Sequence, residues 1–205
     1  MMKLILSLTL IWTLSTTAEV LKCFVGEGSS SSSQTCEAGE ICAAVARKVD
    51  GKKTSAKCVP SSLFSVGNHT LSLNIGDGSV TAAVRVCDKD DCNNQTIPFP
   101  DVQEKNNLKC FTCDDKSPPV CNKTVQCEGV QDRCINGINA TSAGKYAFFG
   151  CVSENLCNAA RLEFLMADKG LDQPKCCKGN LCNSAWSVQL NVIPLLFGLF
   201  TLIFY

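Results

Sequence analysis

The sequence predicts an all-β, disulfide-rich protein made of two tandem repeats. Cysteine is unusually frequent, with 16 among 205 residues, and this density in a short chain is typical of a disulfide scaffold. Short runs of β-type sequence are separated by clusters of Gly, Asn, Asp and Ser, as β-hairpins require. Cysteine-bearing motifs also occur twice in the same order. Disulfides at this density indicate an oxidising compartment outside the cytosol.

Residues 1–18 have the pattern of a secretory signal peptide. A lysine precedes a short apolar core at residues 4–14, and Thr16 and Ala18 occupy the −3 and −1 positions of a small-residue cleavage site. The apolar core is too short to span a bilayer as a membrane anchor. We therefore expect the mature chain to begin at Glu19.

Two copies of one unit follow, a first repeat at residues 19–95 and a second repeat at residues 108–183. Their shared motifs are an opening Leu-Lys-Cys-Phe at residues 21–24 and 108–111, and a closing Cys-x4-Cys-Asn at residues 87–93 and 177–183. Residues 96–107 contain two prolines and a polar run, which disfavour a helix or a central strand. This segment is expected to be a linker between two domains.

The pattern within each repeat is that of β-strands. Residues 70–75 alternate with a period of two, residues 79–86 are rich in β-branched side chains, and residues 145–152 are apolar and aromatic. The serine run at residues 29–33 predicts a flexible loop tip. A unit of this size cannot bury a large core, so disulfides are expected to supply part of its stability.

The second repeat resembles a complete domain of the lymphocyte antigen 6 / urokinase receptor family, whose three-finger fold is shared with snake toxins. The residues that carry the resemblance are the opening Leu-Lys-Cys-Phe-Thr-Cys at residues 108–113 and the closing Cys-Cys-Lys-Gly-Asn-Leu-Cys-Asn at residues 176–183. All ten cysteines of the family pattern are present there. The resemblance implies two tandem three-finger domains.

The family's pairing implies eight disulfides. In the second repeat these are Cys110–Cys134, Cys113–Cys121, Cys127–Cys151, Cys157–Cys176 and Cys177–Cys182. The first repeat departs from the pattern by losing cysteines in whole pairs, with Gly26 and Val86 at two of the family positions. Its implied bridges are Cys23–Cys42, Cys36–Cys58 and Cys87–Cys92. Two missing bridges predict a looser first finger and a less stable first domain.

The C-terminus carries an uncharged apolar segment at residues 188–205, preceded by three small residues, Asn183, Ser184 and Ala185. This order is typical of a glycosylphosphatidylinositol (GPI) signal, in which the hydrophobic tail is removed. We expect GPI attachment at Asn183, with Ser184 as the runner-up, and removal of residues 184–205 as a propeptide. A single-pass helix is the alternative, although no basic flank follows the apolar segment.

Surface features suggest where glycans and partners attach. Four sequons for N-glycosylation are centred on Asn68, Asn94, Asn122 and Asn139. The predicted central finger of the first repeat has an Asp-Gly hairpin turn flanked by cations, so a contact with an acidic protein, sulfated glycan or anionic headgroup is one reading and a solvated hairpin tip is the other. Phe148 and Phe149 are consecutive in a predicted strand, so one is a candidate contact unless an interdomain surface covers it. The candidate partner contacts are Arg47, Lys48, Lys52, Lys53 and Phe149.

No catalytic or metal site is predicted, and no cofactor is expected. The single histidine, His69, lies within a sequon and is read as an exposed loop residue. The Cys-x2-Cys pair at Cys110 and Cys113 could be half of a zinc site, but no second half accompanies it, which favours disulfides. A formal net charge of zero gives no electrostatic case for bulk binding to nucleic acid.

These features predict a GPI-anchored glycoprotein on the extracellular face of the cell membrane, with no enzymatic activity. The family resemblance implies a receptor, co-receptor or modulator that binds an extracellular or cell-surface protein through its finger loops. The alternative is a secreted two-domain inhibitor that resembles the serum phospholipase inhibitors. The fold alone does not fix the ligand.

Overall fold

A computed structural model of the chain describes residues 20–49, 51–76, 78–113, 121–141, 144–166 and 171–184. The expected signal peptide at residues 1–18 and the apolar tail at residues 188–205 lie outside the described residues. Among the described residues, no helix has the length and apolar character needed to cross a membrane. The account below concerns the two repeats and the segment that joins them.

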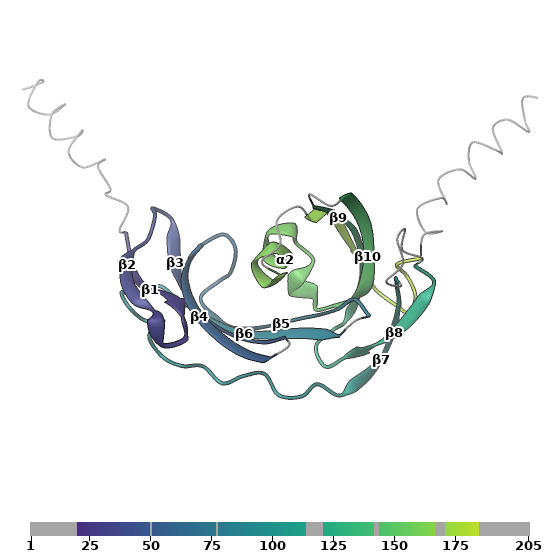
Figure 1. Cartoon of the computed structure of the whole chain (residues 1–205), viewed down its shortest axis with the longest axis horizontal. Helices are drawn as coiled ribbons and strands as arrows, with labels where there is room; N and C mark the ends of the chain where they lie inside the picture. Colours follow the sequence, from purple (N-terminus) through teal and green to yellow (C-terminus); the bar gives the residue numbers. More distant parts are fainter. Residues whose placement is uncertain are drawn as a thin grey trace, which may run out of the picture. The chain divides into compact units, whose positions relative to one another are not determined.

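The first repeat contains three hairpins of antiparallel strands (Figure 1). Its strands are β1 (Lys22–Glu27), β2 (Ser32–Thr35), β3 (Glu40–Val49), β4 (Gly51–Pro60), β5 (Gly67–Asn74) and β6 (Ser79–Cys87). The serine run expected to be a loop tip forms the short 3-10 helix η1 (Gly28–Ser30) and the edge strand β2 instead. The residues of β2 form a strand because they pair with β1, from Val25↔Ser32 to Lys22↔Thr35.

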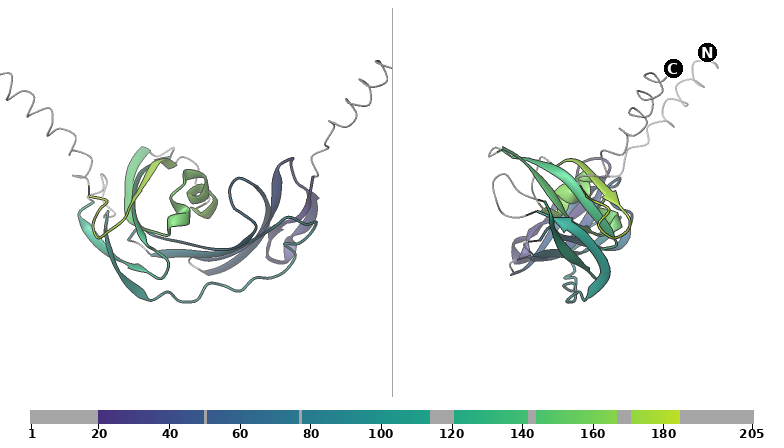
Figure 2. Two further views of the ribbon diagram at one scale, coloured as in Figure 1. Left: turned by 180° about the vertical axis from the view of Figure 1, so that it is seen from behind. Right: turned by 90° about the vertical axis from the view of Figure 1, so that its right-hand side faces the viewer.

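The second repeat has the same order of fingers, with one change in the third. Its strands are β7 (Lys105–Thr112), β8 (Lys123–Glu128), β9 (Arg133–Thr141), β10 (Gly144–Val152) and β11 (Leu171–Cys177). The segment between β10 and β11 contains η2 (Glu154–Leu156) and the helix α2 (Ala159–Met166), where the first repeat has β5. β7 begins within the predicted linker, and residues 97–104 remain as an extended segment without regular structure that leads into β7 (Figure 2).

Helix α2 forms for local reasons. The side-chain Oδ1 of Asn158 accepts a hydrogen bond from the backbone N–H of Ala160 at 2.9 Å, which is the geometry of an N-cap. Leu162 and Leu165 are three residues apart, face the same side of the helix and are both buried. The helix therefore packs one apolar face inward.

Nine strands form one hydrogen-bonded order, β11-β9-β10-β5-β6-β3-β4-β1-β2, while β7 and β8 form a separate two-stranded sheet. The chain nevertheless divides into two compact units that do not coincide with the repeats. Unit 1 comprises Met1–Ala44, Thr54–Gly67 and Arg85–Thr96, and unit 2 comprises Val45–Lys53, Asn68–Val84 and Ile97–Tyr205. Unit 2 thus combines the second repeat with the tip of the β3–β4 hairpin and most of the β5–β6 hairpin.

Every cysteine of the chain is in a disulfide. The eight bridges are Cys23–Cys42, Cys36–Cys58, Cys87–Cys92, Cys110–Cys134, Cys113–Cys121, Cys127–Cys151, Cys157–Cys176 and Cys177–Cys182. These are the pairs that the family resemblance implies. The protein is therefore mostly β with a disulfide core at the base of each repeat.

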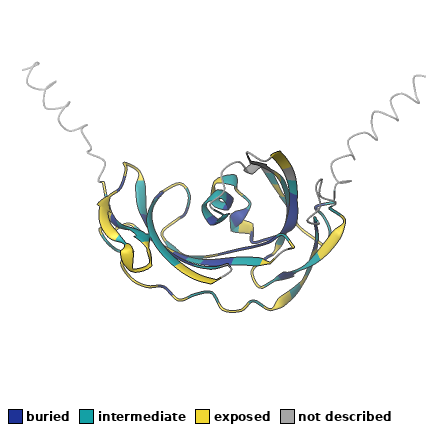
Figure 3. Ribbon diagram, in the orientation of Figure 1, coloured by how far each residue is buried: buried dark blue, intermediate teal, exposed yellow. Residues whose placement is uncertain are grey.

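The strand expected at residues 70–75 is present as β5, but its burial is not that of a half-exposed strand. Leu71 and Leu73 are buried as the alternation predicts, and the polar Ser72 and Asn74 between them are buried as well. Figure 3 shows buried stretches along both β5 and β10. β5 pairs with β10 through Asn74↔Cys151 and Leu73↔Val152, and the side chain of Gln131 lies against Ser72, to whose hydroxyl it donates a hydrogen bond.

Candidate binding surface

The basic tip of the β3–β4 hairpin does not present all of its cations to solvent. Arg47 is half-buried, and its Nη1 donates a hydrogen bond to the backbone oxygen of Leu165 at 2.8 Å. Leu165 lies in the last turn of α2, where carbonyl groups lack partners within the helix and a cation is favoured by the helix dipole. Arg47 therefore joins the hairpin to the second repeat and is not available as a partner contact, which corrects its assignment from the sequence.

Lys52 also makes a contact within unit 2. Its Nζ lies 5.3 Å from the centre of the Phe99 ring, in the linker segment, within the range of a cation–π interaction. The lysine is nevertheless exposed. The hairpin tip therefore contacts both α2 and the linker, through Arg47 and Lys52 respectively, and is not an entirely solvated tip.

Lys48 and Lys53 are the other two cations of the same hairpin tip. Successive side chains of a strand alternate between faces, so Lys48 lies opposite Arg47 and Lys53 lies opposite Lys52. Lys53 is exposed and Lys48 is half-buried. In the described part of the chain, the carboxylates that form ion pairs, Asp132 and Glu154, pair with Arg133 and not with these lysines. These two lysines thus remain as candidate partner contacts at the hairpin tip.

Phe149, the aromatic candidate for a partner contact, is only 9% exposed, and Phe148 is buried too. The strand that carries them, β10, pairs with β9 along one edge. At its C-terminal end, the other edge pairs with β5. The ring of Phe148 packs on the backbone of Gly137 in β9, since a Cβ placed there would lie 2.6 Å from two ring atoms. The assignment of Phe149 to a partner surface is therefore corrected to a core position.

The asparagines that close the repeats are buried and fully hydrogen-bonded. The Nδ2 of Asn183 donates to the backbone oxygens of Phe111 (3.0 Å) and Ile135 (2.8 Å), and its Oδ1 accepts from the N–H of Phe111 (2.9 Å). Asn93 makes the same three bonds in the first repeat, with Phe24 and Ala43. The expected lipid-attachment residue is thus part of the framework of its domain, and the runner-up, Ser184, is half-buried beside it.

Three of the four predicted glycan acceptors, Asn68, Asn94 and Asn122, are exposed. Asn139 lies in β9, but its side chain is outside the described residues. Exposure is what N-glycosylation of a folded surface requires, and occupancy of the four sequons stays a prediction.

The chemistry-bearing residues do not assemble into a catalytic or metal site within the described residues. The Sγ atoms of Cys110, Cys127 and Cys151 lie close together, as do those of three cysteines in the first repeat, but all of them are in disulfides. His69 lies in the strand β5 and is half-buried, which corrects the expectation of an exposed loop residue.

Sequence analysis missed a buried polar cluster that involves both repeats. The amide of Gln131, fully buried in the turn between β8 and β9, donates to the hydroxyls of Ser72 at 2.9 Å and Ser79 at 3.1 Å. No local pattern marks Gln131 as buried, because a glutamine in a turn is normally exposed. The only signal was the alternation around Ser72, which places this residue on the polar face of its strand. Nothing in the sequence indicated what covers that face.

Comparison with known proteins supports the family resemblance of the second repeat. Residues 108–183 match the family model described as snake toxin and toxin-like protein. The crystal structure of mouse TEX101 is similar, with 15% sequence identity over 78% of this chain and 99% of that chain and a TM-score of 0.27, values too low to inform function. No match to a curated protein was found by sequence comparison. Residues 108–183 therefore form a domain of the snake toxin and toxin-like protein family.

Proposed function

We propose that this protein is a GPI-anchored cell-surface binding protein whose partner contact is the tip of the β3–β4 hairpin, through Lys48 and Lys53. The observation that supports this proposal is that two of the four cations at the hairpin tip, Arg47 and Lys52, are engaged in contacts within the protein. Arg47 is tied to α2 and Lys52 lies over Phe99, whereas strand alternation turns Lys48 away from Arg47 and Lys53 away from Lys52. The three-finger fold supports a binding or modulating role.

Two properties of this tip favour a binding role. The hairpin is held by the contacts of Arg47 and Lys52, so the other lysines are positioned before a partner arrives and less conformational entropy is lost on binding. Two cations at the hairpin tip, Lys53 exposed and Lys48 half-buried, also attract an anionic partner and increase its association rate. An acidic patch on an extracellular protein fits this chemistry best, because two lysines offer point charges rather than the bidentate geometry of arginine.

The test is proximity labelling around the anchored protein on cells, with the double variant Lys48→Glu/Lys53→Glu. We expect this variant to lose neighbours that the wild type labels. Lys105→Glu/Lys123→Glu is the matched control, since both lysines are exposed on β7 and β8 and the change in net charge is the same. An identical set of neighbours for the wild type and for both variants would contradict the proposal.

We propose Ser184 rather than Asn183 as the residue that receives the GPI lipid. The lipid is joined to the backbone carboxyl of the attachment residue. Because Asn183 is buried and Ser184 is half-buried, attachment at Ser184 keeps this linkage one residue away from the packed framework. Release from cells by phosphatidylinositol-specific phospholipase C, followed by trypsin, is expected to give a C-terminal peptide that begins at Gly179 and ends at Ser184. A peptide that ends at Asn183 would restore the first assignment, and retention of the protein at the membrane would contradict the anchor.

A further inference from the structure

The β5–β6 hairpin of the first repeat has a polar surface that is buried. Ser72 is fully buried, and Asn74 and Thr81 are nearly so. Burial of hydroxyl and amide groups without hydrogen bonds costs free energy, so such groups need specific partners. Two bonds are internal: the hydroxyls of Ser72 and Thr81 are 3.3 Å apart, and the N–H of Gly76 donates to the Oδ1 of Asn74 at 3.0 Å. The other partners come from the second repeat.

Two residues of the second repeat supply these partners. Gln131 donates both of its amide hydrogens to the hairpin, to Ser72 and Ser79, while its Oε1 accepts from the N–H of Glu128 at 2.9 Å. The hydroxyl of Ser153 accepts from the N–H of Ser72 at 3.0 Å, and the N–H of Ser153 donates to the oxygen of Ser72 at 2.9 Å. We call this set of contacts the inter-repeat seam, formed by Ser72, Ser79, Gln131 and Ser153.

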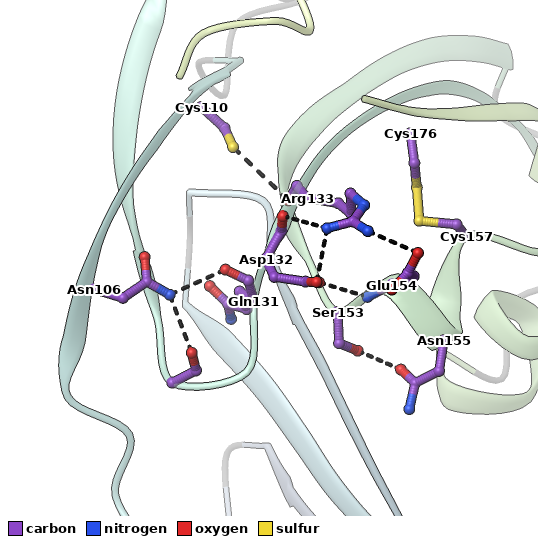
Figure 4. A network of polar contacts seen from close by, with 11 residues as sticks. Asn106, Cys110, Gln131, Asp132, Arg133, Ser153, Glu154, Asn155, Cys157 and Cys176 are labelled. Atoms are coloured by element: carbon purple, nitrogen blue, oxygen red, sulfur yellow. Dashed lines mark hydrogen bonds and ion pairs between the residues drawn. A yellow bond between two sulfur atoms is a disulfide. The ribbon is translucent and has the colours of Figure 1, made fainter. Parts of the chain in front are cut away.

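A second group of bonds holds the seam residues of the second repeat in place (Figure 4). The Nη2 of Arg133 pairs with Glu154 at 2.7 Å, and its Nη1 pairs with Asp132 at 2.7 Å. The other oxygen of Asp132 accepts from the N–H of Glu154 at 2.9 Å. These bonds connect Asp132, which follows Gln131 in the chain, to Glu154, which follows Ser153. The second repeat therefore presents both seam residues in fixed positions.

The backbones also approach closely beside the seam. A Cβ on Gly150 of β10 would lie 2.0 Å from the backbone oxygen of Asn74 in β5, so only glycine allows this approach. The hydroxyl of Thr112 donates to the oxygen of Ile75, and the amide of Asn155 donates to the oxygen of Thr70 at 2.9 Å. Contacts from three elements of the second repeat thus meet one strand of the first.

No disulfide joins the two repeats. Each of the eight disulfides lies within one repeat, so only the linker joins the repeats covalently. The third finger of the second repeat has the bridge Cys157–Cys176, whereas the β5–β6 hairpin lacks the corresponding bridge and has the buried Val86 at that family cysteine position; its one cysteine, Cys87, pairs with Cys92. The hairpin without this bridge is the one that the second repeat covers.

We propose that the inter-repeat seam is an intramolecular docking surface that takes the β5–β6 hairpin in place of its missing disulfide and keeps the repeats together without the linker. The proposal is independent of the anchor and of the lysine contacts. It implies that a protease that cuts the exposed linker on the cell surface does not release the first repeat.

The experiment is cleavage of the native chain at one engineered site. A recognition sequence for a site-specific protease is inserted between Asp101 and Val102, which are both exposed, with Val102 79% exposed. After cleavage we expect two fragments on a non-reducing denaturing gel and a single species of unchanged mass by native mass spectrometry and gel filtration. Separation into two species under native conditions would overturn the proposal.

A steric variant tests the position of the seam. Gly150→Ala places a methyl group against the backbone of β5, and we expect its cleaved fragments to separate. Gly137→Ala is the control, because a methyl there meets the ring of Phe148 within the second repeat, and its fragments should stay together. Gln131→Ala serves as a second variant if Gly150→Ala does not fold. Fragments that stay together in the seam variants would contradict the assignment.

Discussion

Asn93 and Asn183 close the two repeats with the same three hydrogen bonds. Each side chain joins the end of its repeat to the first strand and to the second finger, using both amide hydrogens and the carbonyl oxygen. A buried amide with all three bonds made is costly to replace, because the backbone groups around it would be left without partners. These two asparagines therefore fix the base of each repeat together with the disulfides.

Asn183→Asp tests this at the scale of one residue. The change keeps the acceptor for Phe111 but removes both donated bonds and introduces a carboxylate that faces two backbone oxygens. We expect the free energy of unfolding to fall by about 3 kcal/mol in urea denaturation. The matched control is Asn180→Asp in the same loop, where the exposed Oδ1 only accepts from Lys109, and a change of less than about 0.5 kcal/mol is expected. Similar stabilities for the two variants would contradict the framework role.

Another residue shows why a family cysteine is absent from the first repeat. Gly26 has a φ of +144°, a backbone conformation that residues with a side chain rarely adopt. A Cβ at this position would lie 2.7 Å from the Cα of Ser31. The first finger therefore bends where its counterpart in the second repeat is bridged, and a cysteine at residue 26 would not fit without a shift of the chain.

At the scale of elements, the sequence predicted the strands better than their surroundings. Cysteine spacing and alternation located β5, β6 and β10 because these signals are local. The sequence did not predict that polar Ser72 faces Gln131, since that contact joins residues 59 apart. Helix α2 was also missed, although Asn158 followed by Ala, Arg, Leu and Glu is a recognisable helix start.

The candidate site on the β3–β4 hairpin was likewise predicted from the sequence only in part. Its four cations were identified from the sequence as one charged tip. Strand alternation separates Arg47 from Lys48 and Lys52 from Lys53, but only the positions of Leu165 and Phe99 reveal which of these cations make contacts within the protein. Phe149 was misassigned for a related reason, because a strand sequence alone does not show that the side chains on both of its faces are buried.

At the scale of the whole molecule, sequence repeats and compact units differ. The repeats are units of sequence with their own disulfides, whereas unit 2 includes strands of both repeats. The β5–β6 hairpin is therefore expected to open together with the second repeat and not with the rest of the first. Amide exchange reports such cooperative units directly.

Hydrogen–deuterium exchange on the intact, non-reduced chain is the most direct measurement of this central claim. We expect the amides of Ser72 and Leu73 in β5 to exchange as slowly as those of Cys151 and Val152 in β10, and more slowly than those of the exposed edge strand β2. Gly150→Ala should speed exchange in β5 and leave β2 unchanged. Fast exchange in β5 beside slow exchange in β10 would show that the hairpin moves independently and would contradict the account.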